Sequence, residues 1–115
     1  MLSLIYILMK VIKIDVHKKN VYETELHGDP IQEIRNLIGA PGHETAHKFE
    51  TGDKLFIDGD GGWNSKKWFE LGYKEHGYKK FYGNGVIIHY EKYVYSSTKK
   101  SIDQIRSIVR FESKS

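Results

Sequence analysis

The chain has apolar residues arranged with two different periods, and each period predicts one kind of secondary structure. The run from Leu4 to Val16 is rich in branched apolar side chains, and the sequence VYETEL at residues 21–26 alternates with a period of two. The polar sequence HKKN at residues 17–20 separates the two runs. This combination is typical of a β-hairpin. We therefore expect the chain to begin with two antiparallel strands.

Two later segments repeat apolar residues at the spacing of an α-helix. Over residues 30–38 the repeat is preceded by Asp29, which can cap a helix, and it stops at Gly39. A second apolar face runs over residues 101–110 and starts with the sequence Ser-x-x-Gln, a capping box. These features predict two helices, at about residues 30–38 and 101–110.

The segment between the two helices consists of short strand-like runs separated by the turn sequences TGD, DGDGG, EHG and GNG. A chain of 115 residues buries enough surface for one core. Residues 1–115 are therefore expected to form a single domain, with residues 1–8 as a candidate N-terminal extension. The predicted class is α+β: a mostly antiparallel sheet of about five strands, with both helices on one face.

Composition limits the chemistry that such a domain can perform. The chain is 39% hydrophobic, 29% charged and 13% aromatic, which is typical of a globular protein rather than a disordered one. It contains no cysteine, so a metal would have to bind through His, Asp and Glu side chains, and the chain suits a reducing compartment. We expect a cytoplasmic protein without a cofactor.

The apolar N-terminus lacks the features of a targeting segment. No positive charge precedes the run, and no small-residue cleavage site follows it. The first charge is at Lys10, far short of the roughly 20 apolar residues that a membrane helix needs. A strand this apolar suits burial on both faces or pairing across a subunit interface. We therefore expect no membrane partner, and the strand favours a homo-oligomer.

Several segments together suggest a family. They are KVIKID at residues 10–15, IQEIRNLIG at residues 31–39, LFIDGDG at residues 55–61 and FYGNGVII at residues 81–88. With these features the chain resembles a family of small proteins from bacteria, phages and mobile elements that is described only as a domain of unknown function. The resemblance implies an accessory protein encoded by a phage or mobile element, and it identifies no catalytic residue.

The sequence HETAH at residues 43–47 matches the H-E-x-x-H pattern of zinc proteases. In those enzymes the pattern lies on a helix, where two histidines one turn apart bind the ion and the glutamate activates a water molecule. His43 and His47 have this spacing, and Asp53 follows His43 by ten residues. These three residues are the candidate metal ligands of a zinc-dependent hydrolase.

The same stretch also fits a β-hairpin, with HETAHKFE and KLFID as strands and ETGD as the turn. In a strand, His43 and His47 would share a face about 13 Å apart, at roughly 3.3 Å per residue, which is too far to bind one ion. A helix in this position would have only Ala46 and Phe49 as apolar anchors. We expect the hairpin.

Charge is distributed unevenly along the chain. Residues 1–62 have a net charge of −3, whereas residues 63–100 contain eight lysines and three glutamates, a net charge of +5. Aromatic rings interleaved with cations are typical of surfaces that bind single-stranded nucleic acid, although an alternating strand would place half of the rings in the core. The predicted ligand- or partner-binding residues are Trp63, Lys66, Lys67, Trp68, Tyr73, His76, Tyr78, Lys79, Lys80 and Tyr82.

No candidate nucleophile has an identifiable base near it in the sequence. We therefore predict no catalytic residue and expect a protein that binds rather than catalyses. Residues 63–100 contain no arginine, which argues against bidentate recognition of phosphates or bases. The favoured hypothesis is that the chain binds a protein partner. The alternatives are binding of a nucleic acid or nucleotide, and zinc-dependent hydrolysis by HETAH.

Overall fold

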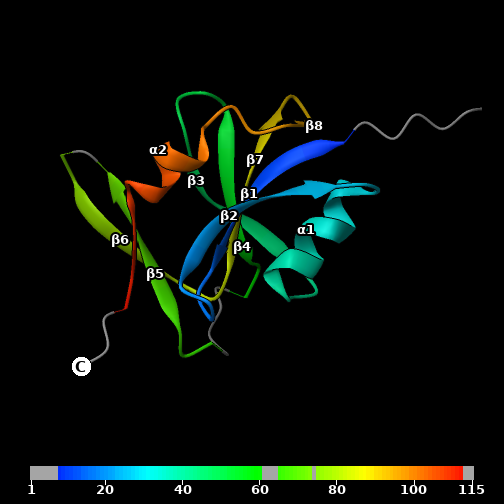
Figure 1. Ribbon diagram of the computed structural model, residues 1–115. Helices are drawn as coiled ribbons and strands as arrows, with labels where there is room; N and C mark the ends of the chain where they lie inside the picture. The colour runs from blue at the N-terminus through cyan, green and yellow to red at the C-terminus, as the bar shows by residue number, and fades with distance from the viewer. Residues whose placement is uncertain (1–7, 61–64, 74, 113–115) are drawn as a thin grey trace, which may run out of the picture.

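The structure is a computed structural model that describes residues 8–60, 65–73 and 75–112, with the side chain of Tyr73 left out. Among the described residues, six of the nine strands form one antiparallel sheet with the strand order β2-β1-β7-β4-β3, and β8 pairs with the far end of β7 (Figure 1). These strands are β1 (Met9–Asp15), β2 (Asn20–Leu26), β3 (His43–Lys48), β4 (Asp53–Asp58), β7 (Gly85–Glu91) and β8 (Val94–Ser96).

A second, smaller sheet has three strands in the order β6-β5-β9. Its strands are β5 (Trp68–Tyr73), β6 (Gly77–Tyr82) and β9 (Val109–Phe111), and all of them pair antiparallel. The two helices are α1 (Pro30–Ile38) and α2 (Ile102–Arg106). The predicted α+β class with mostly antiparallel pairing is therefore confirmed.

The predicted N-terminal hairpin is confirmed, with β1 and β2 paired over all seven residues of each strand. Asp15 closes the turn by accepting hydrogen bonds from the backbone N–H groups of His17 and Lys18, both at 3.0 Å. Burial raises the pKa of Asp15, but these hydrogen bonds and the charges of Lys13 and Lys18 outweigh burial and lower the pKa overall. The described part of the strand starts at Met9, so residues 4–7 of the predicted strand lie outside the described residues.

Alternation along the strands divides the core into two layers, one on each face of the large sheet. On one face, α1 packs over the sheet through Ile34 and Ile38, which contact Val11, Leu26, Phe56, Val86 and Ile88. On the other face, the small sheet and α2 contribute Phe69, Leu71, Phe81 and Ile105, which contact Ile12, Ile14, Leu55, Ile57 and Ile87. The large sheet is therefore covered on both faces.

The first helix has the predicted ends. The Asp29 side chain accepts a hydrogen bond from the backbone N–H of Ile31 at 3.2 Å. At the other end Gly39 adopts a φ of 82°, a left-handed conformation that glycine takes without the Cβ clash of other residues. Local sequence was sufficient here because the cap, the apolar face and the stop lie within eleven residues.

Three details of the predicted fold are wrong. The two helices lie on opposite faces of the large sheet rather than on one face (Figure 1). The described residues form nine strands rather than about five. The second helix ends at Arg106 instead of residue 110, because Val109 and Phe111 pack on the core while Arg110 between them faces outward, which is the period of a strand. Among the described residues, no helix is long and apolar enough to cross a membrane.

Candidate binding surfaces

The HETAH sequence forms β3, which pairs antiparallel with β4, so the predicted hairpin is confirmed. The two histidines do not share a face, however. Thr45 pairs with Phe56 and His47 with Leu55, so Ala46 is an extra residue that makes a β-bulge. One extra residue in a strand sends all later side chains to the opposite face.

The bulge separates His43 and His47 by the full thickness of the sheet. His43 lies on the face covered by α1, where its ring packs edge-on against Phe56 with centroids 5.0 Å apart and its Nδ1 accepts a hydrogen bond from Arg35 Nε at 3.2 Å. His47 lies on the other face, where its ring centroid is 4.6 Å from that of Phe49. The expectation of a shared face is wrong, and two side chains on opposite faces of a sheet cannot bind one ion.

Asp53, the third candidate metal ligand, is fully buried and has a structural role. Its carboxylate accepts hydrogen bonds from the backbone N–H groups of Lys99 and Lys100, from the Thr98 hydroxyl and from His89 Nδ1, at 2.7–3.0 Å. Burial raises the pKa of Asp53, but these hydrogen bonds outweigh burial and lower it overall. Within the described residues, no three His, Asp or Glu side chains are grouped so that they could hold a metal ion.

The predicted aromatic and basic segment folds into the β5–β6 hairpin, and alternation distributes its side chains over two faces. Phe69, Leu71 and Phe81 point into the core. Lys66 and Lys67 are exposed immediately before β5. Trp63 and the side chain of Tyr73 lie outside the described residues. The remaining predicted residues therefore belong to two separate surfaces.

The first surface, which we call the outer face, is the solvent side of the small sheet. It consists of Trp68, Tyr78, Lys80 and Tyr82 from the β5–β6 hairpin, together with Glu70 and Arg110. The Nζ of Lys80 lies 4.1 Å from the centroid of the Trp68 ring, and the Arg110 guanidinium lies 3.4 Å from that of Tyr78. Such cation–π contacts hold the charged groups against the rings. Tyr78 is 42% exposed and Tyr82 40% exposed.

Arg110 and Glu70 are the residues of the outer face that were not predicted, and Arg110 was missed because its segment was assigned to a helix. It pairs across the sheet with Glu70, and its Nη2 lies 3.3 Å from Glu70 Oε1. The alternation of Val109, Arg110 and Phe111 was the available signal. Three residues are too short a run to outweigh the helical pattern that precedes them.

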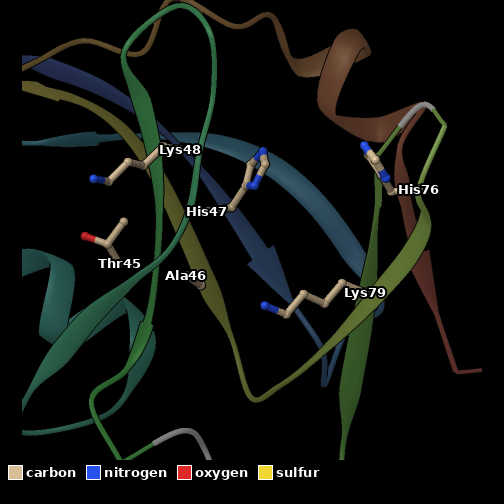
Figure 2. Close-up of a pocket in the computed structure, with 6 residues that line it drawn as sticks. All are labelled: Thr45, Ala46, His47, Lys48, His76 and Lys79. Carbon is tan, nitrogen blue, oxygen red and sulfur yellow. The ribbon is translucent and has the colours of Figure 1, made fainter.

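The second surface, which we call the edge groove, lies between β3 and β6, the terminal strands of the large and small sheets. Its first cavity has a volume of about 590 Å³ and is lined by Thr45, Ala46, His47, Lys48, His76 and Lys79 (Figure 2). Figure 2 shows Lys79 extending from β6 toward β3, whereas Thr45 and Lys48 point away from the gap. Lys79 and Lys80 are neighbours in the sequence but serve different surfaces, because strand alternation turns them to opposite faces.

The imidazole of His47 lies at the centre of the edge groove. Burial lowers its pKa, the carboxylate of Glu50 raises it and the ammonium of Lys79 lowers it, and the net effect is a lowered pKa. The lowered pKa favours the neutral form of the imidazole.

A comparison of the chain with protein-family models, with curated proteins and with solved structures finds no match.

Proposed function

We propose that this protein is a non-catalytic binding module that recognises an acidic surface of another protein through its outer face. The observation that carries this proposal is the gathering of Trp68, Tyr78, Tyr82, Lys80 and Arg110 on one exposed side of the small sheet. Trp, Tyr and Arg are the residue types that contribute most to binding energy at protein interfaces. The sheet behind them is anchored in the core by Phe69 and Phe81, so the surface is rigid before binding.

The arrangement of charges favours an acidic protein over a nucleic acid. Binding of single-stranded nucleic acid uses aromatic ring faces on which bases stack. In the outer face, Lys80 covers the ring of Trp68 and Arg110 covers that of Tyr78. A base could stack on either of these two rings only by displacing a cation, whereas a carboxylate can approach the cation without disturbing the ring.

Charge complementarity identifies the kind of partner surface. Lys80 and Arg110 contribute two positive charges and Glu70 one negative charge, and Lys66 and Lys67 add two exposed positive charges at the start of β5. A partner that presents carboxylates around an apolar centre would satisfy both the cations and the rings.

Pairing with a second copy through the N-terminal strand stays a prediction. The central residues of β1 are already used inside the fold, since they pair with both β2 and β7.

The proposal is tested with a matched pair of variants. Immobilised wild-type protein is used to capture proteins from a lysate of the source cells, and each captured protein is purified and its Kd measured. We expect a partner whose binding is lost in the double variant Lys80→Glu/Arg110→Glu and retained in Lys79→Glu, which has its charge change on the opposite face of the same strand. Binding should weaken as salt is raised, because the attraction is electrostatic.

A third variant tests the aromatic part of the surface. Trp68→Ala should weaken binding about 30-fold or more, which corresponds to the roughly 2 kcal/mol of an interface hot spot. Thermal unfolding of each variant checks that the fold is retained. An oligothymidine of about 20 nucleotides is titrated in parallel. Binding of the oligonucleotide that depends on Lys80 and Arg110 would contradict the protein proposal and assign the outer face to nucleic acid.

A further inference from the structure

The edge groove is independent of the outer face, since the two lie on opposite sides of β6. Its first cavity adjoins a second of about 690 Å³, and both are lined by His47, Lys48 and His76. Cavities of several hundred cubic ångströms are the size of small-molecule sites. Both β3 and β6 end their sheets, so no further strand of the described chain covers the opening.

One end of the groove collects hydrogen-bond donors from three parts of the fold. His47 comes from β3, His76 from the turn before β6, and Lys79 from β6 itself. In Figure 2 these three side chains lie on both sides of the gap between the strands. Among the described residues, no acidic residue lines the first cavity. Two imidazoles and one ammonium group that line the same cavity suit an anion with several acceptor oxygens.

The other end of the groove is partly apolar. The lining of the second cavity includes Phe49, Gly72, Ile105 and Ile108. Ile105 is 0% exposed, so the half-buried Ile108 offers more apolar contact. Two acidic residues are also in this lining. Glu50 is bound to the ammonium group of Lys100, and Glu75 lies in the turn beside His76. The groove therefore has a cationic end and an end that offers apolar contact.

We propose that the edge groove binds a small phosphorylated molecule, with the phosphate at His47, His76 and Lys79 and the organic part against Ile108. A phosphate monoester carries close to two negative charges near pH 7 and has three terminal oxygens, one for each of the three donors. A carboxylate carries only one negative charge, so it would attract these donors less strongly than a phosphate monoester does.

Binding of a phosphate has a measurable consequence for His47. Among the described residues, the titratable groups that line the groove together with His47 are Lys48, Glu50, Glu75, His76, Lys79 and Lys100. A dianion placed next to the imidazole favours its protonated form, so the pKa of His47 should rise when the site is filled. A ligand that binds elsewhere would leave the pKa of His47 unchanged.

The test uses phenyl phosphate as the probe, because it joins a phosphate monoester to an apolar ring. The Cε1–H resonances of His47 and His76 are followed by NMR during a titration at pH 7. We expect saturable shifts of both resonances, binding at least tenfold weaker in Lys79→Gln, and unchanged binding in the matched control Lys80→Gln. Inorganic phosphate and phenol, titrated separately, should each bind more weakly than phenyl phosphate.

The result that overturns the proposal is equally specific. If phenyl phosphate gives no saturable shift at His47 and His76, or if Lys79→Gln and Lys80→Gln weaken binding to the same extent, the groove is not a phosphate site. Phenol binding as tightly as phenyl phosphate would also contradict it. The outcome is independent of the proposed protein partner, whose binding depends on Lys80 and not on Lys79.

Discussion

The buried carboxylate of Asp53 provides a direct test of how this fold is held together. Asp53 is the first residue of β4, and it receives hydrogen bonds from Thr98, Lys99 and Lys100, in the loop between β8 and α2. His89 of β7 donates a further hydrogen bond from Nδ1 at 3.0 Å. The perturbation is Asp53→Ala, which removes the acceptor for all four groups at once.

The expected decrease in the free energy of unfolding follows from the donors that Asp53→Ala leaves without an acceptor. Two backbone N–H groups, one hydroxyl and one imidazole lose a charged acceptor in a site where Asp53 itself is 0% exposed. Hydrogen bonds to charged groups contribute about 1.5–3 kcal/mol each, and they are not additive. Removing one partner from a buried charged network costs about 3–5 kcal/mol. For a domain of this size, that loss corresponds to a decrease in Tm of roughly 12–20 °C.

The pH dependence of the stability difference between wild type and Asp53→Ala provides a second test. The pKa of Asp53 is lowered in the folded protein, so its contribution to the free energy of unfolding is complete above the pKa of the unfolded chain. That contribution is lost as the pH falls through the folded-state pKa. The difference in stability between wild type and Asp53→Ala should therefore be constant near neutral pH and shrink below about pH 4.

The measurement is urea unfolding followed by far-ultraviolet circular dichroism, repeated between pH 7 and pH 3. Asp58→Ala is the matched control, because Asp58 is the last residue of the same strand, is only partly buried and accepts a hydrogen bond from the backbone of Asp60. We expect the control to cost less than about 1 kcal/mol. A cost below about 1 kcal/mol for Asp53→Ala, or a stability difference that does not change in acid, would refute the reasoning.

Three further changes are expected to have defined effects. Gly85→Ala should cost about 1–3 kcal/mol in urea unfolding, because a Cβ there would lie 2.8 Å from Leu55 Cδ1. Ser101→Ala should cost about 1 kcal/mol in the same assay, because the capping box of α2 loses its hydroxyl acceptor. Arg35→Gln should raise the pKa of His43 measured by NMR, since burial lowers that pKa first and the Arg35 charge lowers it further.

Each of these predictions has a control in the same chain. Gly42→Ala adds a methyl group with nothing within 4 Å and should leave stability within about 0.5 kcal/mol of wild type. Ser101→Thr keeps the capping hydroxyl and should recover most of the loss. Arg106→Gln changes an arginine that donates to the backbone oxygen of Val21, so the pKa of His43 should stay constant. Equal effects in a variant and its control would contradict the corresponding prediction.

Elements that depend on short-range sequence were predictable without the structure. The hairpin of β1 and β2, the caps of α1 and the hairpin formed by HETAH are each specified by residues within about a dozen positions of one another. Turn residues, cap residues and the period of the apolar pattern act over that range. The sequence therefore determined the α+β class and the strand structure of HETAH.

The tertiary structure decided which face each functional side chain occupies. The bulge at Ala46 moved His47 to the face opposite His43, and Arg110 joined the outer face only because β9 pairs with β5. Asp53 acquired its role from a loop about 45 residues away. These outcomes depend on register and on contacts between distant segments, and one added residue in a strand reverses every side chain after it. Periodicity within a segment carries no information about such long-range pairing, so the two surfaces on either side of β6 become visible only in the folded chain.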